Sequence, residues 1–548
     1  MRAHTMAQLL RERADARPDE VAVRLREGGG WTEWSWSQYW QAAAAAAAVL
    51  RASGVAPGDR VLVLVPEIRQ AVTCLFGIWA AGAVPVHLGA PPAQDRAAFL
   101  AGLIETARLL DARAAILPAG LAAAAPPGPL RWLDADAVAR GEPAAPLEEP
   151  AASWGTAFIQ LTSGTTARPR GVVVTHERLM LHMAAMSSRL PSHAASVAVS
   201  WLPLYHDMGL VGGLLFPFYN GFPGHMIATG DFQRQPAVWL DAMSRFRGTI
   251  TAAPPSAYAV CTQLAPRLAA GGLDLSAWEC AMVGAEPISA QVLRRFAAAF
   301  APAGFRAEAF FPVYGLAEAT VAVTFPDLLA PARIDRIDRR ALERDGRAVP
   351  AADEDGAIEL VAVGRAIPRT EIRIVREDGE IAAARTVGEI QVRSDTLMAG
   401  YYGDPGATAD AVSGGWLRTG DLGYEAAGLL FVTGRQKEII IRGGQNLVPA
   451  VLEEIASSVE GVRPGGVAAV GVRSESRQSE LVCVVAETKL EEPRHREIAA
   501  QIRSALRARG VSPDRVVLVP PRSLPRTTSG KIRRLELARR LAAEATPP

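Results

Sequence analysis

The N-terminal third of the chain alternates segments that favour helix with segments that favour strand, and this alternation constrains the fold most strongly. An alanine-rich run at residues 41–48 predicts a helix that ends near Gly54. After a turn at residues 57–59, the apolar run at residues 60–65 predicts a fully buried strand. A further apolar segment precedes a second strand-like run at residues 84–86. Such alternation is typical of a parallel sheet with helices on both faces, so we predict an α/β fold.

The pattern changes in the second half of the chain. Short strands with hairpin turns follow residue 365, as in residues 371–375 and 388–392. The last roughly 110 residues have the composition of a separate α+β unit of ordinary domain size. Because 548 residues are too many for one core, we predict two domains, residues 1–435 and 436–548.

The charge balance and the cysteines exclude several classes of protein. The chain has 58 basic and 57 acidic residues, which gives no reason to expect nucleic acid or an anionic membrane as partner. Its N-terminus has no apolar signal region, and no segment reaches the ~18 apolar residues of a membrane span. We therefore expect a cytoplasmic protein without stable membrane insertion. Four cysteines lie far apart and are expected to be buried thiols: Cys74, Cys261, Cys280 and Cys483.

A hydroxyl- and glycine-rich loop lies between two β-favouring runs, residues 157–161 and 172–174. Hydroxyls and free backbone N–H groups in one turn suit the oxyanions of a polyphosphate. An ordinary turn has the same composition, so the loop alone leaves both interpretations open. It is not a Walker A loop, because residues 169–171 lead into a strand and not into a helix. The candidate phosphate-binding residues are Thr162, Ser163, Gly164, Thr165 and Thr166.

Four further motifs follow the loop in order, at residues 314–318, 415–421, 432–435 and 525–531. Together the five motifs resemble those of the acyl-adenylate-forming superfamily, which includes acyl-CoA synthetases, luciferases and adenylation domains. The resemblance covers nearly the whole chain, and five motifs in fixed order are far more specific than one. It implies a large N-terminal domain of doubly covered sheets plus a distorted β-barrel, and a small mobile α+β C-terminal domain. The hinge is expected at Gln436 and Lys437.

The resemblance implies that ATP activates a carboxylic acid as an acyl-AMP, with pyrophosphate release. The loop would then hold the β- and γ-phosphates, and Glu318 would bind Mg²⁺, a hard cation that prefers oxygen ligands. Lys531 would be the catalytic counter-charge between the attacking carboxylate and the α-phosphate. It would arrive on the mobile domain for this half-reaction only.

The same resemblance assigns the nucleoside site. Asp421, expected just past a turn at residues 419–420, would accept both ribose hydroxyls, and Arg435 would lie next to the ribose. Alone, Asp421 would be interpreted as a turn cap and Lys531 as a surface lysine. The residues expected to line the adenine are Gly284, Ala285, Glu286 and Tyr314, and Gly315 is expected to bind ATP as well.

The acyl pocket is expected to follow the run at residues 201–210, with His206 as a gate between the carboxylate site and the pocket. Asp207 stands where adenylation domains keep the aspartate that pairs with an amino-acid ammonium, which leaves an amino or hydroxy acid open. Pro255 and Ser256 replace the Asn-Phe usual in the fatty-acid branch, which favours an unusual or short acyl chain. The expected pocket residues are Trp201, Asp207, Met208, Gly209, Pro255, Ser256 and Tyr258.

Three segments bear on the acceptor of the acyl group. Residues 201–210 and 313–320 look like the fatty acyl-AMP ligases, and residues 331–365 lie where that branch carries an insertion. In that branch the insertion packs on the large domain and disfavours free CoA, so the acceptor would be the phosphopantetheine thiol of a holo acyl carrier protein. The alternative is a charged surface loop without this role.

Two departures from the pattern keep alternatives open. Residues 442–449 are closer to the Gly-Gly-x-Asn form of acyl-CoA synthetases, which puts the acceptor in doubt. Ala167 and Arg170 replace a glycine and a lysine of the usual loop, and a left-handed alanine would cost about 1 kcal/mol. The alternatives are an acyl-CoA synthetase, an amino- or hydroxy-acid adenylating enzyme, and a non-catalytic nucleotide-binding scaffold. The scaffold predicts loss of Glu318, Asp421 or Lys531, and all three are present.

Overall fold

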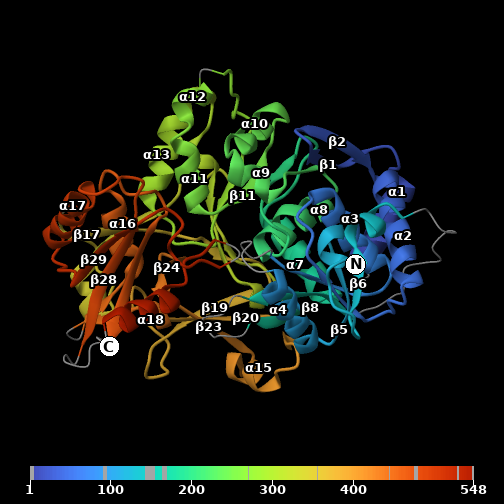
Figure 1. The fold of residues 1–548 in the computed structure, drawn as a ribbon. Helices are drawn as coiled ribbons and strands as arrows, with labels where there is room; N and C mark the ends of the chain where they lie inside the picture. The colour runs from blue at the N-terminus through green and yellow to red at the C-terminus, as the bar shows by residue number, and fades with distance from the viewer. Residues whose placement is uncertain are drawn as a thin grey trace.

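The chain folds into a large N-terminal part and a smaller C-terminal part. In Figure 1 the blue N-terminal elements and the red C-terminal elements lie at opposite sides, with the antiparallel strands of the orange segment between them. The computed structural model describes residues 5–89, 96–141, 155–162, 169–269, 271–353, 356–442, 445–473, 479–527 and 530–545.

The first sheet confirms the α/β alternation predicted from the sequence. Its four strands are all parallel, in the order β4-β3-β5-β6. The helix predicted from the alanine run is α2, which begins with a capping box between Ser35 and Gln38 and ends before Gly54. The elements are α2 (Trp36–Ala52), β3 (Arg60–Val63), α3 (Ile68–Ala80), β4 (Val84–His87), β5 (Ala112–Leu117) and β6 (Arg131–Asp134).

A second sheet of seven strands forms the centre of the large domain, in the order β13-β12-β11-β9-β10-β1-β2. Every pairing is parallel except β1 with β2. Several predicted site segments lie just after the carboxyl ends of these strands, where open α/β sheets bind ligands. They are residues 201–208 after β9, 254–256 after β11, 284–286 after β12, and Tyr314, two residues beyond the end of β13. The strands are β1 (Val21–Glu27), β2 (Gly30–Ser35), β9 (Ala198–Ser200), β10 (Gly224–Met226), β11 (Ile250–Ala253), β12 (Cys280–Val283) and β13 (Phe310–Pro312).

The hairpin predicted around the hydroxyl-rich loop is present. Strand β7 (Thr156–Thr162) pairs antiparallel with β8 (Arg170–Thr175), and Thr162 lies opposite Arg170. The other edge of β8 pairs with a two-residue strand from far along the chain, β21 (Gly400–Tyr401). This pairing brings Tyr401 next to the strand that ends the loop. The loop residues 163–168 lie outside the described residues.

An antiparallel sheet supplies the strands expected for the barrel, and it confirms the hairpin predicted after residue 370. It has the order β19-β20-β23-β22, with β24 on β23. The turn predicted before Asp421 is wrong, because residues 419–421 lie within β23. Three residues there stand opposite one residue of β20, a β-bulge in which Gly420 has φ +70°. The strands are β19 (Thr370–Val375), β20 (Gly388–Ser394), β22 (Val412–Ser413), β23 (Trp416–Ala426) and β24 (Leu429–Arg435).

The segment predicted as an insertion is ordered secondary structure. It contains an antiparallel pair, β16 (Ile334–Asp338) and β17 (Ala357–Val361), joined through α14 (Arg339–Asp345). Its buried residues share one hydrophobic cluster with the antiparallel sheet and with the C-terminal part. The cluster includes Ile337, Leu342, Tyr424, Phe431, Val448 and Val451. The insertion therefore packs on both parts of the chain, which a merely solvated loop would not do.

The C-terminal part has its own sheet and cores, as an α+β unit should. Strands β27, β28 and β29 form one sheet, and two hydrophobic clusters lie on it. The boundary after Arg435 stays a prediction. Among the helices described, none is long and apolar enough to cross a membrane. The elements are α16 (Pro449–Ser457), β27 (Val467–Arg473), β28 (Glu480–Glu487), α17 (Arg494–Ala508), β29 (Arg515–Val519) and α18 (Arg534–Ala545).

Candidate functional site

Asp421 forms the centre of a buried polar cluster. Its Oδ1 accepts a hydrogen bond from Arg435 Nε at 2.8 Å, and its Oδ2 accepts one from the Tyr314 hydroxyl at 2.7 Å. The strand register explains the first contact, because Asp421 on β23 lies opposite Arg435 at the end of β24. The charge of Asp421 raises the pKa of Arg435, so this guanidinium stays protonated. Tyr314, Asp421 and Arg435 were predicted to lie around the nucleoside, and the fold brings them together.

Glu318 lies on a short 3-10 turn, residues Ala317–Ala319, after the end of β13. Its Oε1 accepts a hydrogen bond of 2.9 Å from the Tyr401 hydroxyl. Burial raises the pKa of Glu318, while hydrogen bonds to the carboxylate, including that of Tyr401, and the charge of Arg435 lower it. The negative charge of Asp207 also acts on Glu318, so the two carboxylates belong to one site.

Few protein side chains could join Glu318 as ligands of the predicted metal ion. Within the ranges that the structure describes, no group of three or more His, Cys, Asp or Glu side chains could hold a metal ion. A cation at Glu318 would therefore need oxygens from the nucleotide. Such sharing suits Mg²⁺, which is usually bound by one or two carboxylates plus phosphate oxygens.

His206 and Asp207 form a close pair at the start of a π-helix, η1 (Met208–Leu215). His206 Nδ1 lies 2.7 Å from Asp207 Oδ1, and the backbone N–H of Met208 donates to the same oxygen at 2.7 Å. Burial would raise the pKa of Asp207, but the charge and hydrogen bond of His206 and the charge of Lys531 outweigh it and lower that pKa. Asp207 is thus held as a carboxylate inside the site.

Lys531 lies in the C-terminal part, and its charge acts on Asp207 of this pair. The pKa of Asp207 responds to its charge, although Lys531 itself is exposed. A tight turn holds its backbone, since Lys531 N donates to Thr527 Oγ1 at 3.1 Å and Thr527 N donates to Lys531 O at 2.8 Å. A hydrogen bond of 2.5 Å from Ser289 to Glu454 also joins the two parts. The charge of the predicted lysine thus acts on the carboxylate site in this orientation.

Hydrogen bonds between Ser256 and Glu286 join the segment at residues 255–258 to the segment at residues 284–286. Ser256 is the second residue of α11 (Pro255–Thr262), and its backbone N–H and hydroxyl donate to the Glu286 carboxylate at 3.2 and 3.1 Å. Glu286 follows Ala285, whose φ of +67° is unusual for a residue with a side chain. The expected adenine segment and the expected pocket segment therefore touch each other.

The other predicted residues are placed as follows. Tyr258 is fully buried in an aromatic core, and its hydroxyl donates to Met282 O at 3.1 Å. Trp201 is stacked on Phe232, with ring centroids 3.6 Å apart. Met208 and Gly209 begin η1, whereas Gly284 directly follows β12. Gly315 is in β14 (Tyr314–Gly315), and the hinge residues Gln436 and Lys437 form a 3-10 turn.

Part of the predicted site cannot be placed. Ser163, Gly164, Thr165, Thr166 and Ala167 lie outside the described residues. Residues 443–444, which bear on the acceptor, lie outside them as well. Thr162, at the end of β7, marks where the loop begins.

Tyr401 was missed from the sequence, although it contacts the candidate metal ligand. The pairing of β21 with β8 helps to bring it to Glu318, and that pairing joins residues more than 200 positions apart. Arg170, which replaces a lysine of the usual loop, has its guanidinium carbon 5.1 Å from the centre of the Tyr401 ring.

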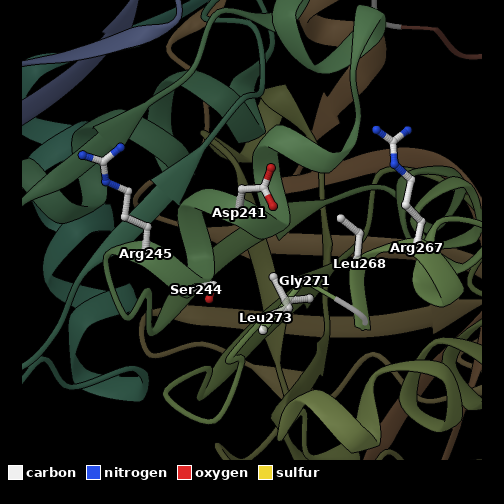
Figure 2. Close-up of a pocket in the computed structure, with 8 residues that line it drawn as sticks. Asp241, Ser244, Arg245, Arg267, Leu268, Gly271 and Leu273 are labelled. Carbon is white, nitrogen blue, oxygen red and sulfur yellow. The ribbon is translucent and has the colours of Figure 1, made fainter.

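A cavity of about 310 Å³ lies on α10 (Ala237–Arg245), α12 (Ala265–Ala269) and the loop that follows. Figure 2 shows Arg245 and Arg267 on either side of the Asp241 carboxylate. Its lining contains none of the predicted site residues: Asp241, Ser244, Arg245, Arg267, Leu268, Gly271, Gly272 and Leu273.

The α/β sheets, the Asp421 cluster and the charge of Lys531 on Asp207 are the features expected of an adenylate-forming enzyme. The chain belongs to the family of AMP-binding enzymes, whose family model matches residues 10–402. Members of this family use ATP.

Relatives and a solved structure agree on the kind of reaction. A putative acyl-CoA synthetase of Caulobacter vibrioides is 34% identical over 88% of this chain and 86% of its own length. The medium-chain-fatty-acid–[acyl-carrier-protein] ligase JamA of Moorena producens is 31% identical over 87% and 84%. A structure from studies of fatty acyl-adenylate ligases of E. coli and L. pneumophila superimposes with a TM-score of 0.89 and 31% identity, covering 98% of each chain. The protein is therefore a ligase that forms an acyl-AMP.

Proposed function

We propose that the protein activates a fatty acid with ATP and Mg²⁺ and then passes the acyl group to the phosphopantetheine thiol of a holo acyl carrier protein. In the first step a carboxylate oxygen attacks the α-phosphorus, the bond to the bridging oxygen breaks, and pyrophosphate leaves. In the second step the thiol adds to the acyl carbonyl, AMP leaves, and the thiol proton is lost. The observation that carries the choice of acceptor is the packing of the insertion on both parts of the chain.

The nucleoside is held by the Asp421 cluster in this proposal. Each carboxylate oxygen of Asp421 already accepts one hydrogen bond, from Arg435 or Tyr314, and keeps a lone pair for a ribose hydroxyl. The two donors fix the carboxylate in one orientation, so the ribose meets a preorganised acceptor. The loop from Thr162 to Thr166 would hold the β- and γ-phosphates.

Glu318 offers one carboxylate oxygen to the nucleotide-bound cation, because the other accepts the hydrogen bond of Tyr401. When bound, Mg²⁺ would neutralise charge on the phosphates and hold them in position. Lys531 brings a compact ammonium to the point where the attacking carboxylate and the α-phosphate meet, and electrostatic stabilisation there lowers the barrier.

The His206–Asp207 pair favours a fatty acid over an amino acid. An adenylation domain would use this aspartate to bind the substrate ammonium, whereas Asp207 Oδ1 is already engaged by His206 and by the Met208 N–H. Asp207 then serves to orient the His206 ring at the entrance of the acyl pocket. Pro255 and Ser256 begin α11, and the bonds from Ser256 to Glu286 fix this end of the pocket.

The energetics of domain movement favour a carrier protein over free CoA as the acceptor of the acyl group. Rotation of residues 436–548 about Gln436 and Lys437 would separate Val448 and Val451 from Ile337 and Leu342 of the insertion. Exposure of such side chains costs roughly 25 cal/mol per Å². A carrier protein can offset this cost with contacts of its own, whereas free CoA has far less surface to offer.

The test is a parallel assay of both half-reactions. The enzyme is incubated with ATP, Mg²⁺ and a series of fatty acids of increasing length, with amino and hydroxy acids as competitors, and pyrophosphate release is measured. CoA and holo carrier protein are then offered separately. We expect carrier loading to exceed acyl-CoA formation by at least tenfold. Equal rates would refute the choice of acceptor, and preferential turnover of amino acids would refute the substrate class.

A further inference from the structure

The loop that carries Glu318 is fastened to the segment before β21. Met398 N donates to Glu318 O at 2.8 Å, and the Thr320 hydroxyl donates to Thr396 O at 2.7 Å. Thr320 is fully buried and has a φ of +67°, a conformation that a β-branched residue rarely adopts. Tertiary hydrogen bonds must therefore hold this loop in place.

A buried histidine, His182, also joins this loop to the segment before β21. His182 Nε2 accepts the backbone N–H of Ala322 at 3.1 Å, so the other ring nitrogen carries the proton and donates to Thr396 Oγ1 at 3.1 Å. His182 is fully buried, and burial lowers its pKa to about 3, which keeps the ring neutral. The backbone is thus fixed on both sides of the contact between Tyr401 and Glu318.

Tyr401 completes this support at the carboxylate itself. Its hydroxyl donates to Glu318 Oε1 at 2.9 Å, and the guanidinium of Arg170 lies against its ring. Arg170 is also the residue opposite Thr162 at the base of the phosphate loop. One continuous line of contacts therefore runs from the loop through Arg170 and Tyr401 to Glu318.

We propose that Tyr401 is a positioning residue for adenylate formation, which holds the Glu318 carboxylate so that one oxygen points at the nucleotide-bound cation, and that Arg170 holds the Tyr401 ring. The physical reason is that the last torsion of a glutamate has a broad, two-fold energy profile and does not fix the carboxylate by itself. A hydrogen bond to a charged group does fix it. The inference rests on the proposed role of Glu318.

The variant Tyr401→Phe tests this proposal, because it removes only the phenolic hydroxyl. In Tyr401→Phe, we expect Mn²⁺, bound together with a non-hydrolysable ATP analogue, to dissociate about tenfold more readily, as measured by electron paramagnetic resonance. The magnitude is that of one hydrogen bond to a charged group. The Mg²⁺ concentration for half-maximal activity should rise in parallel, whereas the KM for the fatty acid should not change. Unchanged Mn²⁺ affinity would overturn the proposal.

Tyr402→Phe is the matched control, since Tyr402 is the next residue and lies under Arg60, with 5.7 Å between the guanidinium carbon and the ring centre. We expect it to leave Mn²⁺ affinity as in the unaltered protein. Arg170→Lys keeps the charge but loses the flat guanidinium, and should weaken Mn²⁺ binding less than Tyr401→Phe does. Equal melting temperatures of the variants confirm that the fold is intact.

A double-mutant cycle separates positioning from a structural effect. If Tyr401 acts through Glu318, then Tyr401→Phe should add less than twofold to the loss caused by Glu318→Gln. Independent, multiplicative losses would overturn the inference. Failure of the proposed function has a different signature, because Mn²⁺ affinity would still fall in Tyr401→Phe while no fatty acid releases pyrophosphate.

Discussion

Arg339 of the insertion donates a hydrogen bond to the backbone carbonyl of Arg509, which follows α17 in the C-terminal part. The guanidinium also pairs with Glu343 at 2.7 Å, and both side chains are about 95% buried. The insertion thus touches the C-terminal part through a polar contact in addition to its apolar cluster. Both contacts would have to break for the proposed rotation of residues 436–548.

The double variant Arg339→Met/Glu343→Leu should loosen this attachment without leaving a buried charge unpaired. Removal of Arg339 alone would strand Glu343 and destabilise the protein by roughly 3–5 kcal/mol, whereas apolar replacement of both partners is often neutral. We expect acyl-CoA formation to rise at least fivefold relative to carrier loading. Arg344→Met/Asp345→Leu, at an exposed pair on the same helix, is the control. Unchanged CoA use would contradict the acceptor argument.

Lys531→Ala should separate the two half-reactions. We expect acyl-AMP formation to fall at least 100-fold, because the counter-charge for the attacking carboxylate is lost. Transfer from preformed acyl-AMP should stay within about threefold. The control is Lys489→Ala, at an exposed lysine of the same part of the chain. Equal losses in both assays would disprove the role given to Lys531.

Asp421→Asn should weaken the use of ATP. The amide keeps the size of the side chain but leaves Arg435 without its ion pair, and a hydrogen bond to a charged group contributes about 1.5–3 kcal/mol. We expect kcat/KM for ATP to fall roughly 10- to 150-fold, with little change in the KM for the fatty acid. Steady-state pyrophosphate release at varied ATP concentrations measures this fall in kcat/KM. Asp410→Asn, on an exposed residue, should have no effect.

The large domain should lose stability in acid. Burial lowers the pKa of His87 and His176 to about 4, and of His182 and His225 to about 3. The unfolded chain therefore binds more protons below about pH 6.5, and the free energy of unfolding falls from there toward pH 4. The slope is at most about 1.4 kcal/mol per pH unit for each histidine.

Chemical denaturation at several pH values, followed by tryptophan fluorescence, measures this loss, since all 11 tryptophans precede residue 436. His87→Leu should flatten the slope by about one histidine's share, whereas His495→Gln, in the C-terminal part, should leave it unchanged. A stability that does not depend on pH between 7 and 5 would show that burial does not lower the pKa of these histidines below that of the unfolded chain.

Local pattern was enough to predict the alternation of helix and strand in the first sheet, and motif order named the three residues that meet at Asp421. Asp421 and Arg435 lie 14 positions apart on two consecutive strands, so a hairpin brings them together as expected. The bulge at Gly420 was taken for a turn, because a glycine with positive φ is typical of both.

Contacts between distant segments could not be predicted in this way. Tyr401 reaches Glu318 through the pairing of β21 with β8 and the hydrogen bond from Met398 to Glu318, and such long-range contacts leave no local pattern in the sequence. The sequence likewise left a charged surface loop open as the alternative for the insertion, since its few apolar residues, such as Ile337 and Leu342, find their partners in other parts of the chain.

The shared cluster between the insertion and α16 also affects the lifetime of the intermediate. An acyl-AMP is a mixed anhydride, which water can hydrolyse. If the C-terminal part covers the acyl-AMP in this orientation, the packing of Ile337 and Leu342 in one cluster with Val448 and Val451 would limit the entry of water. The cluster would then keep the activated acyl group enclosed until an acceptor arrives.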